Sequence, residues 1–582
     1  MKGHKQKIDP ILLEVFRNLF NSISDEMEVT LIRTAYSTNI KDRRDCACGI
    51  YNVEGDVITQ SELATPVHLG TMPPVVKAVL EKIPLSGFRE GDAVVVNSPY
   101  PYGPGHLNDI AVVAPFFYRD RLVAFFANQA HHVDMGGFAP GSMPFGVSEI
   151  YQEGLQIPPV RIQERGAINN DIIDLIIQNV RTKKEGRGDL LAQLSAIKVG
   201  QDRYREIIEK YGAALVERYT CELLDYAERM VRAGIRDLPG GKFEFTDYIE
   251  GDGFTDDLIK IHVSVNIEDE RIVFDFSGSH RQVRGPINCR WPSVAACVQY
   301  VVKSILDPCL PTNAGAFRPI EIIVEEGSLL NCRYPAALCN SNLITTQRIV
   351  DVLLGAFYRV IPDRVQAASQ GTMNILTMGG PYKDDDYFTF VETYGGGQGA
   401  MHDRDGDDGI QNHMTNTRNA PVEVIENNYP VLVSSYGLIT DSGGPGRSRG
   451  GMGINRKLKI LSREAKLTIG SDREKVRPWG LCGGKSGSPF SIRITGENGK
   501  QTYLGTKTTT RIKEGDTVDI STPGGGGWGD PLTRSIDKIT RDINGGLVTP
   551  HCAEQEYGVV FKKDKRTIDI KATEKYRKEK RS

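Results

Sequence analysis

The segment HLNDIAVVAPFFYRDRLVAFFANQAHHVD, residues 106–134, decides the fold of the region around it. It contains two apolar runs, 110–115 and 122–126, separated by the charged residues 119–121, which is the pattern of two strands joined by a tight turn. In an antiparallel hairpin, the start of the first strand lies beside the end of the second. The segment therefore predicts a hairpin that brings its two ends together.

Side chains suited to metal binding stand at both ends of this hairpin. His106 and Asp109 precede the first run, whereas His131, His132 and Asp134 follow the second. Imidazole and carboxylate together suit Zn²⁺, Mn²⁺ or Fe²⁺, and the lack of thiolates argues against a structural zinc finger. The alternative is a set of polar loop residues that hydrogen-bond to one another. Spacing alone leaves both interpretations open.

The bulk composition is that of a large globular protein. The chain has 582 residues, too many for one hydrophobic core, and 71 basic against 74 acidic residues give a net charge of -3. Such a balance predicts neither a nucleic-acid partner nor an anionic membrane. No signal peptide and no apolar run of spanning length are evident, so a cytoplasmic location is expected. The ten cysteines are too sparse for a disulfide framework and are expected to be reduced, with Cys46 and Cys48 on one face of a strand.

The pattern along the chain predicts a mixed α/β, multi-domain protein with a β-rich C-terminal part. Asp9-Pro10 followed by apolar residues at helical spacing predicts a long amphipathic helix at the start. The expected units are an N-terminal α/β metal-binding domain at 1–235, a central α/β domain with Gly-rich loops at 236–456, a β-rich domain at 457–561 and a basic solvated tail at 562–582.

Glycine-rich stretches at 395–399, 443–451 and 524–527 allow two interpretations. Their backbone N–H groups, with Arg447 and Arg449, could bind an anion, or they could simply form tight turns. The segment 479–486 ends like a phosphate-binding loop, but Trp479 occupies the place of its first glycine. We therefore expect no ATP site in this chain.

Beyond these local patterns, the sequence resembles the hydantoinase B/5-oxoprolinase family over nearly its whole length. The motifs that carry the resemblance are 39–48 (NIKDRRDCAC), 66–72 (PVHLGTM), 105–109 (GHLND), 131–137 (HHVDMGG), 140–142 (PGS), 152–155 (QEGL), 275–278 (DFSG), 313–319, Asn416 with 421–423 (PVE), 441–453 and 478–481 (PWGL). One departure is Asn97-Ser98-Pro99-Tyr100, where the family often has Asn-Asp-Pro-Tyr.

The resemblance implies a mixed α/β fold with one divalent metal, most often zinc or manganese. Carrying the family's ligands over position by position identifies Asp45, His106, Asp109 and His131 as ligands. His132 and Asp134 then stand beside the metal as candidate catalytic residues. Asp45 enters only through the resemblance.

The resemblance also implies a function and a partner. The leading hypothesis is ATP-dependent opening of a lactam, hydantoin or 5-oxoproline-like ring, with ATP and Mg²⁺ bound by a hydantoinase A-type subunit in an α2β2 hetero-oligomer. Bicarbonate is left open as a further reactant. The alternatives are a subunit of an acetone- or acetophenone-type ketone carboxylase, and a non-catalytic scaffold that only positions the ATP-binding partner.

Overall fold

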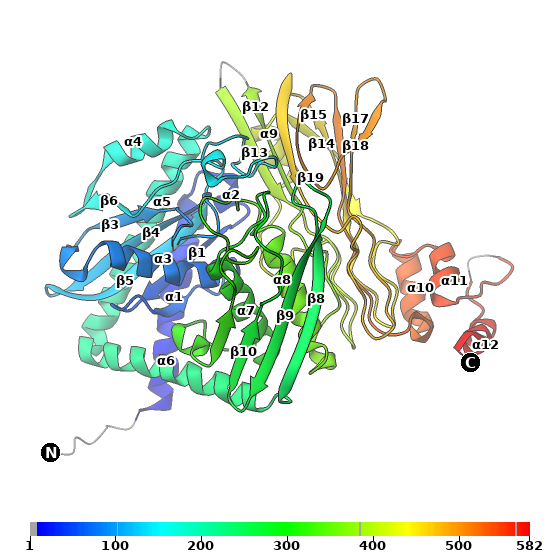
Figure 1. Ribbon diagram of the computed structural model, residues 1–582, viewed down its shortest axis with the longest axis horizontal. Coiled ribbons are helices and arrows are strands. Elements are labelled where there is room, and N and C mark those ends of the chain that lie inside the picture. The colour runs from blue at the N-terminus through cyan, green and yellow to red at the C-terminus, as the bar shows by residue number, and fades with distance from the viewer. Residues whose placement is uncertain (1–7, 102, 383–385, 565–566, 582) are drawn as a thin grey trace.

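The computed structural model describes residues 8–101, 103–382, 386–564 and 567–581. This part of the chain forms four β-sheets with helices packed on them, and the strands are concentrated toward the C-terminal part. In Figure 1 the N-terminal sheet lies at one side, the central helices and strands follow, and the C-terminal helices lie at the opposite end. The predicted mixed α/β fold class is confirmed.

The N-terminal unit is a seven-stranded sheet of order β2-β1-β5-β4-β3-β6-β7, flanked by helices on both faces. Its strands are β1 (Cys46–Tyr51), β2 (Val57–Gln60), β3 (Ala93–Val96), β4 (Asp109–Tyr118), β5 (Arg121–His131), β6 (Val160–Glu164) and β7 (Ala167–Ile168). Its helices are α1 (Pro10–Thr34), α2 (Thr38–Lys41), α3 (His68–Lys82), α4 (Asn170–Gln178), α5 (Lys183–Tyr211) and α6 (Ala213–Arg236).

Alternation along the strands divides the core of this unit into two layers. Cys46 and Cys48 of β1 face the layer that contains α1 and α5, whereas Ala47 and Tyr51 face the layer beneath α3. The two thiols therefore share one face, as predicted, and all ten cysteines of the chain are free. Helix α1 begins as the sequence indicates, because the Asp9 carboxylate accepts the Ile11 N–H at 2.9 Å and Pro10 follows it.

The central unit is a four-stranded sheet of order β11-β10-β9-β8, on which α8 packs against β8 and β9, while α7 packs on α8. Its elements are β8 (Gly241–Glu250), β9 (Leu258–Glu268), β10 (Arg271–Asp275), α7 (Trp291–Leu306), β11 (Ile320–Ile323) and α8 (Thr345–Phe357). Helix α7 also packs on α3 of the N-terminal unit, where a Cβ on Gly70 would come within 2.4 Å of the Ala296 backbone nitrogen. The central unit therefore packs closely against the N-terminal unit through α7 and α3.

The strand-rich part consists of two sheets, of order β13-β12-β16-β19 and β14-β15-β20-β17-β18. Its elements are β12 (Ile375–Tyr382), β13 (Asp386–Thr393), α9 (Val422–Asn428), β14 (Val431–Leu438), β15 (Ile454–Ile460), β16 (Glu464–Gly470), β17 (Ser491–Thr495), β18 (Gln501–Tyr503), β19 (Lys507–Lys513) and β20 (Thr517–Ser521). The expected boundary between 456 and 457 falls inside β15. Each of the two sheets also pairs strands from opposite sides of this boundary. Pairing of strands so distant in sequence leaves no local signal.

The glycine-rich stretches pack against one another. The N–H groups of Gly397, Gly451 and Gly525 donate to the carbonyls of Pro523, Gln398 and Gly451, respectively. A Cβ on Gly525 would lie 2.0 Å from the Gln398 oxygen, so a side chain has no room there. These N–H groups are therefore not free to cradle an anion, and Arg449 is paired with Asp408 at 2.9 Å.

The chain ends in a small helical module with its own apolar cluster. It consists of α10 (Ile536–Asn544), α11 (Pro550–Tyr557) and α12 (Ile570–Arg581), and it lies at the far end of the molecule from the N-terminal sheet (Figure 1). The basic segment expected as a solvated tail thus contains a helix, which is anchored by Thr573 and by Arg577, whose guanidinium donates to the Tyr557 and Arg534 carbonyls. The remaining short helical turns are η1 (Leu85–Gly87), η2 (Ile150–Gln152), η3 (Ala314–Phe317), η4 (Pro362–Arg364) and η5 (Pro531–Thr533).

Among the helices of the described residues, none combines the length and the apolar character that a membrane crossing requires.

Glu28 makes the stability of the N-terminal core depend on pH. It is fully buried on α1, and burial raises its pKa from 4.5 to about 8. Between these values the unfolded chain has lost the proton that the folded chain keeps, so stability falls as pH rises from about 4.5 to about 8. We expect the free energy of unfolding of the wild type to fall by roughly 3–5 kcal/mol over this pH range. The Glu28→Gln variant should not show this fall, because its side chain does not titrate. Thermal unfolding at pH 5 and pH 8.5 tests this, with exposed Glu14→Gln on the same helix as the control. Equal pH slopes in wild type and Glu28→Gln would contradict it.

Candidate metal centre

The predicted hairpin is present and places the first and last residues of its strands side by side. β4 and β5 are antiparallel and are joined by Arg119 and Asp120, which both have positive φ, as a two-residue type I′ hairpin turn requires. The register pairs Asp109 directly with His131 at the far end of the hairpin. His106 lies in the loop that enters β4, so all three side chains meet at one end of the two strands.

These three residues form a compact, buried donor set. One ligand atom each from His106, Asp109 and His131 lies within 4.8 Å of the other two. His106 Nε2 is 3.3 Å from Asp109 Oδ1, and the His106 and His131 rings are 4.9 Å apart. Each side chain is at least nine-tenths buried. The sequence predicted this convergence, and the structure brings the three together.

Asp45 and His68 complete the wall of the same small cavity. β1 lies next to β5, and the His131 N–H donates to the Asp45 carbonyl at 3.0 Å, which brings Asp45 beside the hairpin. His68 is the first residue of α3, and its Nε2 is 3.4 Å from Asp45 Oδ1. Sequence reasoning missed His68 as a site residue, although it stands in the PVHLGTM motif at 66–72.

Several donor atoms in this cavity are buried without a hydrogen-bond partner. They are His68 Nε2, His106 Nε2 and Asp109 Oδ1. Buried polar atoms are almost always paired, so three such atoms in one cavity of about 20 Å³ need an explanation. Two imidazole nitrogens and a carboxylate oxygen are the donors that bind a divalent transition metal. The donor set therefore fits a metal ion, and a cavity of this size leaves room for about one water-sized ligand.

The electrostatics of the cavity hold Asp109 and His131, but not His106, in the protonation state that binds a metal. Burial raises the pKa of Asp109, but the neighbouring imidazoles reverse this and bring it below the ordinary value. Burial lowers the pKa of His131 to about 4, so this ring is neutral at pH 7. For His106 burial lowers the pKa, but the Asp109 carboxylate outweighs it and raises the value to about 9. Metal binding should therefore displace a proton from His106.

A segment of the central unit orients two of these ligands. His106 Nδ1 lies 2.8 Å from the Cys339 carbonyl, and Asn342 Nδ2 donates to Asp109 Oδ2 at 3.2 Å. Glu153 holds this segment, because its Oε1 accepts the N–H groups of Leu338 at 2.5 Å and Cys339 at 2.9 Å. A ring whose Nδ1–H is bound to a carbonyl presents Nε2 to a metal. Residues 338–342 thus act as a strap over the ligands.

Loss of the Glu153 contacts should weaken metal binding. We expect Glu153→Ala to lower metal affinity about 10- to 100-fold, the range found for residues that orient ligands without touching the metal. Glu153→Gln keeps one acceptor oxygen for the two N–H groups and should retain most of the affinity. Competition titration with a chromophoric chelator measures both, with exposed Glu164→Ala as the control and unfolding of the metal-free forms as the check on folding. An unchanged affinity in a folded Glu153→Ala variant would refute this role.

His132 and Asp134 lie close in sequence but do not line the cavity. His132 Nε2 is hydrogen-bonded to Gln193 Oε1 at 3.0 Å. The Asp134 carboxylate accepts three backbone N–H groups and the Arg181 guanidinium, which is 3.0 Å away. Both side chains are occupied in holding the loop that follows β5.

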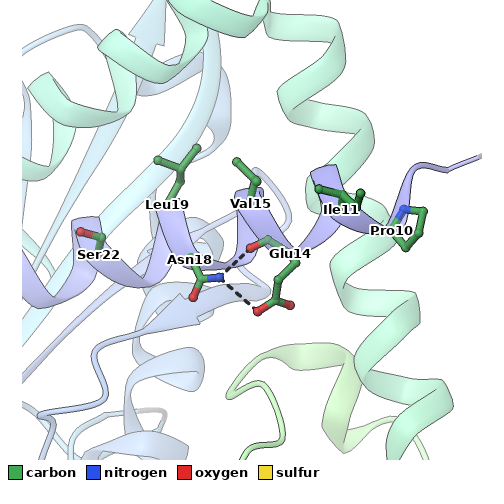
Figure 2. A pocket seen from close by; sticks show the side chains of 7 residues that line it. All are labelled: Pro10, Ile11, Glu14, Val15, Asn18, Leu19 and Ser22. Carbon is green, nitrogen blue, oxygen red and sulfur yellow. Dashed lines mark hydrogen bonds between the residues drawn. The ribbon is translucent and has the colours of Figure 1, made fainter.

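A second hollow lies on the outer side of α1 (Figure 2). Ile11, Val15 and Leu19 form an apolar strip there, and Asn18 donates to the Glu14 carbonyl and carboxylate at 2.9 and 3.1 Å. Glu14 is its one titratable residue, so this strip offers no grouping for chemistry. The metal cavity is the better candidate.

Several known proteins are similar to this chain. Residues 9–531 match the family model described as Hydantoinase B/oxoprolinase. The chain is 41% identical over 574 residues to an uncharacterised protein of Methanocaldococcus jannaschii, covering 98% of this chain and all of that one. It is 32% identical over 589 residues to a Pseudomonas protein provisionally named as the B component of a D-/L-hydantoinase, covering 98% of each. A 5-oxoprolinase of Dictyostelium discoideum is 34% identical over 90% of this chain but only 40% of its own length.

Two solved structures share the fold. The ATP-dependent caprolactamase from Pseudomonas jessenii superposes with a TM-score of 0.90 at 29% identity, covering 98% of this chain and all of that chain. Acetone carboxylase superposes with a TM-score of 0.91 at 20% identity, covering 98% of this chain and 83% of that chain. At this lower identity the second likeness concerns the fold alone.

Proposed function

Because the chain belongs to the hydantoinase B/oxoprolinase family, we propose that it is the catalytic, metal-binding subunit of an ATP-dependent hydrolase that opens a cyclic amide. The observation that carries this proposal is the set of buried, unpartnered donor atoms on His68, His106 and Asp109 in one cavity. The substrates that we propose are a lactam, a hydantoin or a 5-oxoproline-like ring.

The residues of the cavity divide into ligands and supports. His106, Asp109, His131 and Asp45 would hold the ion, and His68 would orient Asp45 or join the ligands. A divalent ion at this place supplies Lewis acidity and lowers the pKa of water. The strap at 338–342 keeps His106 and Asp109 in place, and the apolar side chains of Leu343, Met373 and Ile375 in the cavity wall limit access of bulk water.

The partner in this proposal is a hydantoinase A-type subunit that binds ATP. An unstrained amide is a poor electrophile, and transfer of the ATP γ-phosphoryl group to its oxygen, with release of ADP, would make its carbon a better target for water. Two kinds of relative support a second subunit that performs this activation. One is named as a single component of a hydantoinase, and in the 5-oxoprolinase the region that matches this chain is well under half of the protein.

The two alternatives are less well supported. Ketone carboxylation draws on a neighbour at 20% identity, whereas the amide-hydrolysing relatives are 29% to 34% identical. A scaffold that only positions the ATP-binding partner would have no need for buried, unpaired imidazoles, because such groups reduce stability.

The test is reconstitution of the full chain with its A-type partner. We expect ATP-dependent ring opening of at least one member of a panel of hydantoin, 5-oxoproline and caprolactam, followed by ADP release and product analysis. The partner without this chain is the control. Carboxylation of acetone or acetophenone without any ring opening would replace the proposal with its alternative, and no turnover on the whole panel would reject it.

A further inference from the structure

A groove of about 610 Å³ lies between α3 of the N-terminal unit and α7 of the central unit. The two helices touch along it, where Gly70 of α3 meets Ala296 of α7. None of the residues that line this groove lines the metal cavity. Sites for small molecules in proteins usually have volumes of roughly 300–1,000 Å³ and lie between structural units. The groove therefore has the size and the position of a separate ligand site.

The walls of the groove are mostly apolar, and several of them are flat. Trp291 lines it at the start of α7 and is 40% exposed. Pro73 and Pro74 of α3, Pro292 of α7 and Phe317 line it as well. Proline and aromatic side chains have few rotatable bonds, so they lose little conformational freedom when a ligand binds against them. Such a surface suits a flat, apolar molecule.

One of the basic residues in the lining has no acidic partner. Lys77 Nζ is 2.9 Å from Asp56 Oδ1, and Arg318 is paired with acidic residues of α6. In the part of the chain that the structure describes, no carboxylate lies within ion-pair distance of the third, Arg290. Glu81, the remaining acidic lining residue, is exposed, so water solvates its charge. The charge on Arg290 therefore favours a ligand with one negative group.

The Arg290 guanidinium is held in place by neutral groups. Its Nη1 donates to the Cys332 carbonyl at 2.8 Å, and its Nη2 donates to the Pro101 carbonyl at 2.7 Å. The group also lies over the Tyr100 ring, 5.0 Å from the ring centre. Each Nη carries a second N–H, and the described residues offer no acceptor for either of them. A fixed guanidinium with N–H groups to spare can bind a carboxylate without first ordering its own side chain.

We propose that the groove between α3 and α7 binds a small molecule with a flat, apolar body and one carboxylate, such as an aromatic carboxylic acid. The body lies against Trp291 and the proline rings, and the carboxylate pairs with Arg290. Because the ligand contacts both units, its binding also stabilises the folded chain. This site goes beyond the proposed function, since neither the metal centre nor the ATP-binding partner takes part in it.

The experiment is calorimetric titration of the full chain with 2-naphthoate and, separately, with naphthalene-2-methanol, which has the same ring system without the charge. We expect 2-naphthoate to bind at one site per chain and to raise the temperature of thermal unfolding. The neutral alcohol should bind about 10- to 100-fold more weakly, the range for a hydrogen bond to a charged group. Arg290→Met should weaken the binding of 2-naphthoate by a similar factor, and Trp291→Ala should weaken it about 10-fold.

The matched variants separate the ligand contacts from effects on folding. Arg333→Met removes an exposed arginine close in sequence to Cys332, outside the lining, and should leave the affinity unchanged. Arg290→Lys keeps the charge and should bind more tightly than Arg290→Met. Trp291 is partly exposed, so Trp291→Ala keeps the test decisive even where Arg290→Met fails to fold.

Three results would overturn the proposal: no binding of 2-naphthoate at millimolar concentration, equal binding of the neutral alcohol, or full affinity in the folded Arg290→Met and Trp291→Ala variants. If 2-naphthoate does not bind and Trp291→Ala instead weakens association with the ATP-binding partner, the groove is a protein interface and the proposal is wrong. The titration involves no turnover, so its failure leaves the proposed hydrolase untouched.

Discussion

The Asp109→Asn variant should bind no metal at micromolar concentration. Combined with the partner subunit, it should turn over at least about a thousandfold more slowly than the wild type. This factor corresponds to roughly 4 kcal/mol of transition-state stabilisation by the metal. Asparagine has nearly the shape of aspartate, but it lacks the charge. Asp109 Oδ1 faces His106, while Oδ2 accepts from Asn342 at 3.2 Å. The neutral amide would leave Asp45 as the one anionic ligand of a divalent ion.

A suitable control lies at the other end of the same hairpin. Asp120 occupies the β4–β5 turn with φ 63°, a conformation that asparagine adopts readily, so Asp120→Asn should leave metal content and turnover unchanged. Elemental analysis, thermal unfolding and ADP release by the reconstituted complex measure the three quantities. Full metal occupancy in a folded Asp109→Asn variant would show that the assignment of this ligand is incorrect.

The second large effect is complete dependence on the partner subunit. The isolated chain should neither bind nor hydrolyse ATP, and adding the A-type subunit should restore turnover. The segment 479–486 is the nearest likeness to a phosphate loop, but the N–H groups of Leu481 and Lys485 already donate to the carbonyls of Gly527 and Pro445. The Lys485 ammonium is paired with Glu556. Part of the donor set that a phosphate loop uses is therefore already engaged in this segment.

Calorimetric titration of the metal-loaded chain with Mg²⁺ and ATP measures the first part of this prediction. ADP release with a cyclic amide, before and after addition of the partner, measures the second. Micromolar affinity of the isolated chain for ATP, or ATP-dependent consumption of substrate without the partner, would contradict the division of labour between two subunits. Asp109→Asn in the complex separates loss of the metal from loss of the nucleotide.

The local chemistry of the chain was readable from its sequence. Helix α1 could be predicted because Asp9 and Pro10 set its start and because apolar residues recur at helical spacing. The hairpin of β4 and β5 could be predicted because two short apolar runs flank a tight turn, and antiparallel pairing then requires Asp109 to meet His131. These signals depend on residues that are near neighbours in sequence, so no knowledge of packing was needed.

Asp45 was an intermediate case. Its nearness to His131 follows from the pairing of β1 with β5, which brings together segments about 85 residues apart. Spacing could not reveal that pairing, and the residue was identified only through the family resemblance. His68 lay in an equally visible motif, but nothing in the sequence says that the first turn of α3 is placed over this end of the sheet.

Tertiary structure alone decided what surrounds the metal ligands. The Cys339 carbonyl and the Asn342 amide come from a segment more than 200 residues after His106. The Arg43 guanidinium likewise donates to Thr393, which ends strand β13. The glycine-rich stretches likewise bind one another across the chain instead of forming anion sites. Such contacts arise when distant segments pack together, and their energy depends on fit and burial rather than on any local pattern. The sequence by itself therefore determined which groups could hold a metal, whereas only the folded chain determined how they are oriented and what surrounds them.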